Sequence, residues 1–187
     1  MIRSNTPKDP KVTKEIIALP VSADAPVGRV EELSEPCHPQ LKELYAYWLS
    51  KKGSRIAPPR SAIKPSELRS LLPTIALIDV IGDPPRFCFR LFGTSLAAAY
   101  GQDLTGKFLD EIDIDHIDIE VLRQAEEVVL KCNVQTGRVL FTKRDGRHIE
   151  YERIALPLSN DGRTVNMILV GYVIDAAYGG LSKVWGP

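Results

Sequence analysis

Residues 90–107 read RLFGTSLAAAYGQDLTGK, and this segment says most about how the chain folds. Gly93 ends an apolar extended run, and Thr94 can cap a short helix that Gly101 terminates. Residues 103–106 (Asp-Leu-Thr-Gly) form a turn, where glycine permits a backbone conformation that a side chain would oppose. The segment therefore predicts a strand, a short helix and a turn in close succession.

The segments on both sides of it predict a sheet. Apolar, β-branched and aromatic residues gather in five predicted strands: residues 74–81, 86–92, 137–144, 147–158 and 165–174. A turn at residues 82–85 joins the first two, and Asp145-Gly146 is a strong hairpin signal between the third and fourth. The last strand is the most apolar, so we expect it at the centre of the sheet.

Helical periodicity is clearest before the first strand. Apolar and aromatic residues recur there at helical spacing: Leu41, Leu44, Tyr45, Trp48 and Leu49. Pro39 suits the first turn of this helix and Gly53 its end. A second short helix is expected between Pro65 and Pro73, and a longer helix carries the apolar stripe of residues 121–132. This order predicts an α+β fold, an antiparallel sheet with helices on one face.

Composition and charge exclude several classes of protein. The 187 residues are 44% hydrophobic, which is ordinary for a soluble domain, and 24 Lys+Arg balance 24 Asp+Glu. The zero net charge argues against a protein that coats nucleic acid, so no nucleic-acid partner is predicted. No apolar run approaches the roughly 20 residues of a membrane span. The absence of a secretory signal and the three widely spaced cysteines favour the cytoplasm.

The chain divides into three parts. Residues 1–38 are rich in proline and form a flexible arm, or else a segment that packs on its own domain or on a second subunit. Residues 39–175 contain the predicted helices and strands and form the folded domain. Residues 176–187 form a C-terminal tail.

A set of motifs in this order resembles the PAS domain, in particular a bacterial subgroup of single-domain PAS proteins. The matching residues are Tyr47-Trp48, Pro58-Pro59-Arg60, Leu71-Leu72-Pro73, Arg90–Thr94, Asp103–Gly106 and Leu156–Ser159 followed by Asp161-Gly162. The resemblance covers residues 38–175, and its specificity lies in the order and spacing of the motifs. It implies a five-stranded antiparallel sheet wrapped on one side by the helices between Thr94 and Cys132, with an N-terminal helical extension.

The resemblance also implies a function in sensing. The expected role is that of a stand-alone sensory or signalling module whose output passes to a protein partner by contact. A small ligand would lie between the sheet and the long helix, since such pockets are apolar with a few polar groups. The candidate lining residues are Phe89, Arg90, Tyr100, His116, Leu122, Val129 and Tyr151. Alternatively, side chains fill this space and the domain is a ligand-free interaction platform.

Homodimerisation is a further expectation, because PAS relatives often dimerise through the helix before the first strand. The predicted interface is formed by Leu41, Leu44, Tyr45, Trp48 and Leu49, whose aromatic members supply a large apolar area. The alternative is that this stripe packs on the sheet of its own chain.

Motifs that carry chemistry are missing from the sequence. No phosphate loop, nucleophile elbow or catalytic carboxylate pair at a recognised spacing occurs, so no catalytic residue is assigned and no enzyme activity is expected. A small α+β enzyme whose groups converge only in space stays an alternative. The three histidines lack metal-ligand spacing, so no metal site is predicted. No haem or flavin motif is present, and the cofactor stays unassigned.

Arg90 and a basic hairpin each allow two interpretations. Arg90 lies in an apolar strand, so its charge needs either a structural partner such as Asp79 or an anionic ligand. The structural pair is favoured. The basic residues between Arg138 and Arg153 alternate with acidic ones, which favours cross-strand ion pairs over a phosphate-binding surface.

Overall fold

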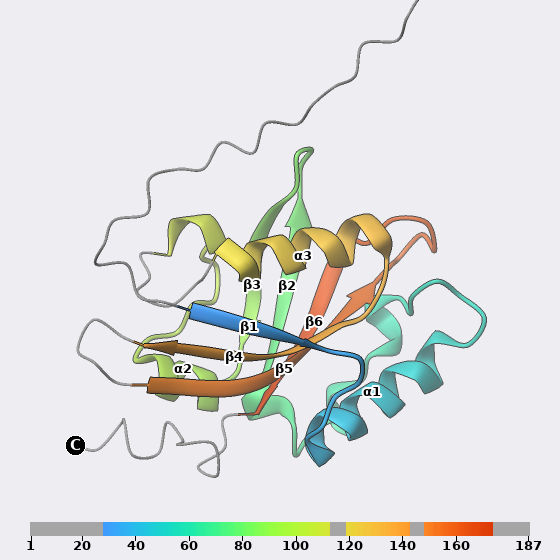
Figure 1. Cartoon of the computed structure of the whole chain (residues 1–187). Helices are drawn as coiled ribbons and strands as arrows, with labels where there is room; N and C mark the ends of the chain where they lie inside the picture. Colours follow the sequence, from blue (N-terminus) through green and yellow to red (C-terminus); the bar gives the residue numbers. More distant parts are fainter. Residues whose placement is uncertain (1–27, 113–118, 143–147, 174–187) are drawn as a thin grey trace, which may run out of the picture.

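The computed structural model describes residues 28–112, 119–142 and 148–173, and these form an antiparallel sheet covered by helices (Figure 1). The strands are β1 (Gly28–Leu33), β2 (Ile75–Ile81), β3 (Arg86–Phe92), β4 (Gln135–Thr142), β5 (His148–Leu158) and β6 (Met167–Val173). The α-helices are α1 (Pro39–Lys52), α2 (Thr94–Tyr100) and α3 (Ile119–Lys131). Short 3₁₀ turns are η1 (Arg60–Ala62), η2 (Pro65–Glu67), η3 (Leu72–Thr74) and η4 (Leu109–Glu111).

The predicted strands are found with small shifts at their ends. The strand order is β1-β4-β5-β6-β2-β3, so β6 lies at the centre between β5 and β2, as its apolar composition predicted. The β2–β3 hairpin is confirmed, and β4 pairs antiparallel with β5. The predicted Asp145-Gly146 turn lies outside the described residues.

The prediction of a short helix between Pro65 and Pro73 is wrong in the type of helix, because the structure has 3₁₀ turns there. This segment forms the 3₁₀ turns η2 and η3, in which amides bond to carbonyls three residues back, as from Glu67 to Lys64. Pro73 has no amide to donate to an α-helical ladder, and the tighter 3₁₀ turn suits so short a segment.

The sheet has six strands rather than the expected five. The extra strand, β1, lies within the predicted N-terminal arm and pairs with β4 along its whole length. Glu31 lies 3.8 Å from Arg138 of β4, and Glu32 accepts a 2.9 Å bond from Arg123 of α3. An edge strand needs only one backbone ladder and tolerates charged residues, so its sequence carries a weak signal beside the prolines around it.

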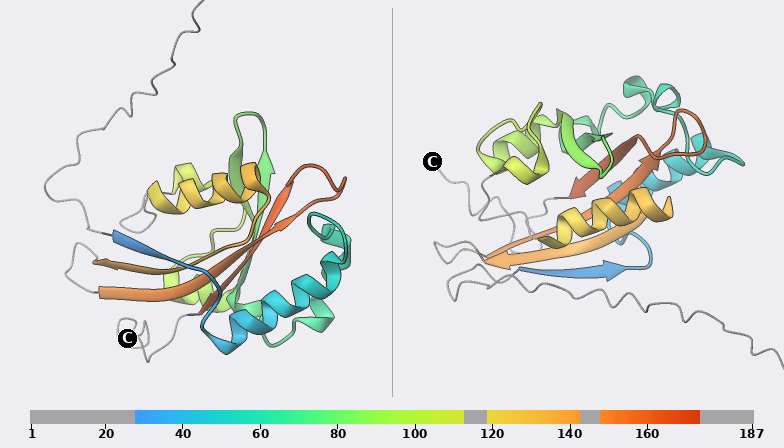
Figure 2. Two further views of the ribbon diagram at one scale, coloured as in Figure 1. Left: turned by 45° about the vertical axis from the view of Figure 1, so that its right-hand side comes forward. Right: turned by 90° about the horizontal axis from the view of Figure 1, so that it is seen from above.

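Both faces of the sheet are covered, and each has its own core (Figures 1 and 2). The helices between Thr94 and Lys131 lie on one face, as expected, whereas α1 lies on the other. Alternation along the strands separates the two cores: Ile75 and Leu77 join the core under α1, and Ala76 and Ile78 join the core under α2 and α3.

Helix α1 packs against β5 and β6 of its own chain. Leu41, Leu44 and Trp48 are at most 3% exposed, and Trp48 Nε1 donates a 2.9 Å bond to the carbonyl of Pro157. Tyr45 is partly buried beside Trp48, with ring centroids 6.2 Å apart, and Leu49 is 45% exposed. Three of the five predicted interface residues therefore cover the sheet of their own chain, because β5 and β6 present it an apolar face.

The buried carboxylate of Glu152 fixes the start of α1 to β5. Its Oε1 accepts bonds from the amides of Cys37 at 2.6 Å and His38 at 3.1 Å. These amides precede the first helical turn, where negative charge also favours the helix dipole. Glu152 lies opposite Arg138 in the register of β4 and β5, but Arg138 forms its ion pair across these strands with Glu150, at 3.4 Å.

Replacing Glu152 with alanine is expected to lower the free energy of unfolding by about 2–3 kcal/mol, because two amides lose a buried acceptor. Glu152→Gln keeps an oxygen in place and is expected to recover most of this loss. Glu150→Ala is the matched control, since a surface pair contributes about 0–1 kcal/mol. Urea unfolding measures all three variants, and equal effects at positions 150 and 152 would contradict this role.

Asp161 organises the turn between β5 and β6. Its carboxylate accepts bonds from the amides of Thr164 and Arg163, each at 2.8 Å, and from the Ser159 hydroxyl at 3.0 Å. These bonds, the amide of Thr164 first, hold the pKa of the Asp161 carboxyl well below its usual value.

A depressed pKa means that Asp161 stabilises the fold above its unfolded pKa, about 3.9, and that this contribution falls as the pH falls further. We therefore expect Asp161→Asn to lower the melting temperature at pH 7, and the difference from wild type to shrink below about pH 4. Thermal unfolding followed from pH 2 to pH 8 checks this, and a difference independent of pH would argue against it.

Candidate functional site

The space between α3 and the sheet gathers most of the predicted ligand-lining residues. Phe89 of β3 is 3% exposed in the core that α2 and α3 cover, and Tyr100, Leu122 and Val129 pack partly buried against the same core. Tyr151 lies beside Tyr172, with ring centroids 5.8 Å apart, and Tyr172 packs against this core as well. Residues far apart in sequence therefore meet where the sequence predicted a ligand.

Two predicted lining residues do not join this group. Arg90 points to the opposite side of β3 from Phe89, its side chain is 59% exposed, and its Nε lies 2.8 Å from Asp79 Oδ1. Its inclusion among the lining residues is corrected: the strand alternation turns Arg90 away from the helices, and the structural pair accounts for its charge. His116 lies outside the described residues.

A buried polar pair between α3 and β5 was missed by the sequence analysis. Gln124 of α3 is 3% exposed and Arg153 of β5 is 5% exposed, and the Arg153 guanidinium donates to Gln124 Oε1 through Nη2. Gln124 lies on the buried side of α3 with Ala125 and Val128. Arg153 lies next to Ile154 on β5, and Ile154 faces the other core, under α1. The sequence did contain a signal for this pair, namely a polar residue within the apolar pattern of α3 and another within that of β5.

The register of the sheet gives Arg153 its neighbours. Across β1, β4, β5 and β6, one row contains Glu32, Gly137, Arg153 and Tyr172. Gly137 has no side chain, so it presents no group to Arg153. Burial raises the pKa of the Tyr172 phenol well above its usual value, which keeps this neighbour neutral at physiological pH. It can donate a hydrogen bond but supplies no negative charge.

The described acidic residues on this side are engaged by other cations. Glu32 pairs with Arg123 at 2.9 Å, and Glu127 lies 2.5 Å from Arg123 and 3.3 Å from Lys131. Within the described part of the chain, Gln124 is the polar partner of the Arg153 side chain, and Gln124 Nε2 has no hydrogen-bond partner. The unpaired Nε2 of Gln124 and the guanidinium of Arg153 are groups that can bind negatively charged oxygen atoms.

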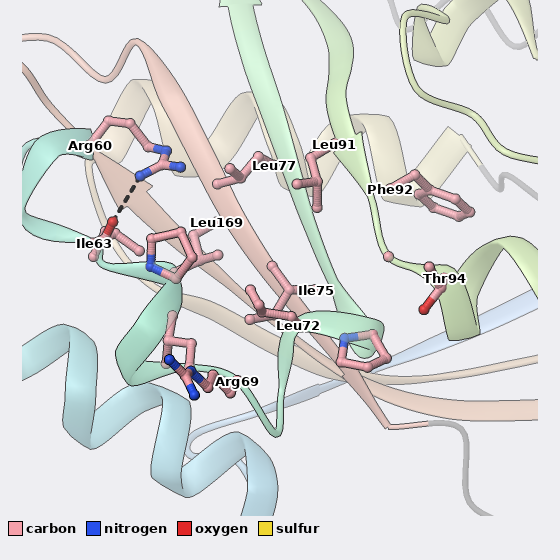
Figure 3. Close-up of a pocket in the computed structure, with 14 residues that line it drawn as sticks. Arg60, Ile63, Arg69, Leu72, Ile75, Leu77, Leu91, Phe92, Thr94 and Leu169 are labelled. Carbon is pink, nitrogen blue, oxygen red and sulfur yellow. Dashed lines mark hydrogen bonds between the residues drawn. The ribbon is translucent and has the colours of Figure 1, made fainter.

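The opposite face of the sheet carries a partly open pocket that the sequence did not predict (Figure 3). It has a volume of about 360 Å³ and lies where the turns η1 to η3 meet β2 and β3. Its lining is mostly apolar, with Arg60 and Arg69 among the lining residues, and Arg60 Nη1 donates a 2.8 Å bond to the carbonyl of Ile63. Because three separate turns form it, no local pattern reveals it.

Within the ranges that the structure describes, no three His, Cys, Asp or Glu residues come together as metal ligands. All three cysteines are free, and burial raises the pKa of the Cys88 and Cys132 thiols, which disfavours reactive thiolates. The described helices include none with the length and apolar character of a membrane span.

Comparison with known proteins gives a family match and a similar solved structure. A family model described as PAS domain matches residues 37–173, while no curated protein matches the chain. A solved structure titled "Structure of an RNA-binding Light-Oxygen-Voltage Receptor" is similar at 13% identity and a TM-score of 0.46. The match covers 79% of this chain and 39% of that receptor. Since the family model spans α1, the whole hairpin β2–β3 and the final strands, this chain belongs to the PAS domain family.

Proposed function

We propose that this PAS domain, a sensory or signalling module by family, binds a small molecule between α3 and the sheet and passes the signal to a protein partner by contact. The observation that carries the proposal is the buried Gln124–Arg153 pair within an otherwise apolar core. Buried polar groups normally have their hydrogen bonds satisfied, and the unpaired Nε2 of Gln124 is an exception that a bound ligand would account for. Of the predicted lining residues, the proposal keeps Phe89, Tyr100, Leu122, Val129 and Tyr151; Arg90 is excluded, and His116 lies outside the described residues.

The connection from this site to the rest of the fold supports a route for the signal. Arg153 contacts α3 on one face of β5, and the adjacent Glu152 holds the start of α1 on the other. Arg123 of α3 also bonds to Glu32 of β1, which leads directly into α1. A ligand that favours one position of α3 would therefore bias α1 and β1, and with them the surface offered to a partner.

The test of ligand binding is native mass spectrometry of protein purified without denaturation. We expect a species heavier than the 20.8 kDa chain, which loses the added mass when the protein is denatured. Refolded, ligand-free protein serves as the control for adducts of buffer. A clean chain mass, combined with no thermal stabilisation by a metabolite extract, would oppose ligand binding and favour the interaction platform.

The ligand-free platform is the second candidate, and the partly open apolar pocket of Figure 3 favours it. Leu91, one of its lining residues, is 38% exposed and adds apolar surface that a partner could cover. Balanced charge supports a protein or small-molecule partner rather than nucleic acid, and three free cysteines support a cytoplasmic location.

Homodimerisation stays a prediction, restricted by the burial of α1. Leu41, Leu44 and Trp48 are committed to the core of their own chain, so the open part of the predicted interface is Leu49 with the exposed side of Tyr45. Sedimentation velocity at rising concentration checks this expectation: we expect a dimer that Leu49→Arg weakens. A wild-type protein that stays monomeric at millimolar concentration would contradict it.

A further inference from the structure

We propose that the small molecule bound between α3 and the sheet is a monocarboxylate with an apolar body, its carboxylate received by Arg153 and Gln124. This inference rests on the proposed function and assigns a chemical class to its ligand. It is carried by the charge of Arg153, by the free amide of Gln124 and by the apolar surroundings of both.

The first argument is the cost of the buried charge. Arg153 is 5% exposed, and an arginine stays protonated inside proteins. An isolated buried charge is strongly unfavourable unless an opposite charge compensates it. The neutral amide oxygen of Gln124 fills a single donor position and supplies no compensating charge. A bound anion would remove this cost and occupy the remaining donors.

The second argument excludes compensation by the described acids. Arg153 and Glu32 share a cross-strand row with Gly137 between them, but the Glu32 carboxylate bonds to Arg123. Glu127 of α3 is also engaged by Arg123 and Lys131. The side chain of Glu152 lies on the opposite face of β5, where it accepts hydrogen bonds from the amides at the start of α1. One positive charge is thus left without a described anionic partner.

The third argument concerns the type of anion. A single uncompensated cation matches a single negative charge, whereas a phosphate dianion would need a second buried cation. A carboxylate can take bonds from the planar guanidinium and from Gln124 Nε2 together. Beyond the carboxylate, Ala125, Val128 and the rings of Tyr151 and Tyr172 offer apolar or aromatic contacts. These surroundings favour an apolar body over a second polar group.

The experiment releases the bound molecule from purified protein by denaturation and identifies it by mass spectrometry. Wild type is compared with Arg153→Met, which removes the charge, and with Gln124→Glu, which gives Arg153 a carboxylate within the chain. Arg163→Met is the matched control, because Arg163 is exposed and its bond to Asp161 uses the backbone amide. Circular dichroism verifies that each variant is folded.

We expect wild type and Arg163→Met to release a monocarboxylic acid, and Arg153→Met and Gln124→Glu to release none. Ligand-free Gln124→Glu should melt at or above the temperature of ligand-free wild type, because the new carboxylate compensates Arg153. In calorimetry, the released acid should bind Arg153→Met about 10- to 100-fold more weakly than wild type, as expected for a lost charged hydrogen bond.

Four outcomes would overturn the inference. A neutral molecule released from wild type, or an acid that Arg153→Met retains with equal affinity, leaves the proposed function standing but removes the carboxylate. A wild-type protein that releases nothing and is not stabilised by benzoate, phenylacetate or hexanoate removes both. If Arg153→Met fails to fold, Gln124→Glu decides: full binding by that variant contradicts the role of Arg153.

Discussion

Replacing Trp48 with alanine is expected to lower the free energy of unfolding by about 3–5 kcal/mol, the usual range for a large buried aromatic residue. Trp48 is 3% exposed in the core between α1 and the sheet, and its indole donates to the carbonyl of Pro157. The substitution would leave a cavity where α1 crosses β5 and would also leave that carbonyl without its donor. Such a loss approaches the whole stability of many small domains.

Leu49→Ala is the matched control on the same helix, because Leu49 is 45% exposed. Its effect should stay within about 0.5–1 kcal/mol. Urea unfolding by circular dichroism at two protein concentrations measures both variants. If Trp48 served a partner rather than its own core, Trp48→Ala would change stability little at low concentration and would abolish any dimer, and this result would oppose the packing described above.

Replacing Gly93 with alanine is expected to cost about 3 kcal/mol or more, or to prevent folding, because the site has no room for a methyl group. A Cβ there would lie 2.3 Å from the carbonyl oxygen of Pro73 and 2.8 Å from that of Ile75. Both atoms belong to the backbone, so relief requires η3, β2 or the start of α2 to move. The Gly93 amide also donates a 2.9 Å bond to Ile75.

Ser95→Ala provides the control for Gly93→Ala, since Ser95 is exposed in the first turn of α2. We expect a melting temperature close to that of wild type for Ser95→Ala and a drop of about 10 °C or more for Gly93→Ala. Calorimetry measures both. Equal melting temperatures would mean that the contact of η3 with α2 is looser than the structure indicates.

The strands and their order along the chain were predictable because their signals are local. The hairpin of β2 and β3 follows from two apolar runs around the turn at residues 82–85, and the centre position of β6 follows from its apolar composition. Strand β1 was not predictable in the same way. Its residues Gly28–Leu33 mix charged and apolar side chains, and only pairing with β4 determines that they are extended.

The helix α1 illustrates a different limit of the sequence. The spacing of Leu41, Leu44 and Trp48 correctly predicted one apolar helical face, but periodicity cannot say which surface covers that face. The sequence left two choices, a second copy or the chain's own sheet, and the structure provides the second for these three residues. The long-range match with β5 and β6 decides this, and no single segment contains it.

The packing of the predicted lining residues in one core was predictable, but the buried polar pair beside them was not. Phe89, Tyr100, Leu122 and Val129 belong to recognisable apolar patterns, so their meeting under α3 follows from the fold. Arg153 appeared as one basic residue in a charged hairpin, and Gln124 as a polar residue beside an apolar stripe. Their contact depends on how α3 packs on β5, and only the folded chain defines this packing.

The most direct test of this account is a crystal structure of the protein purified from cells without a denaturing step. We predict density for a bound molecule between α3 and the sheet, with two oxygen atoms about 2.7–3.0 Å from the nitrogens of Arg153 and Gln124. A structure in which the chain's own carboxylate closes on Arg153, with side chains filling the remaining space, would contradict it.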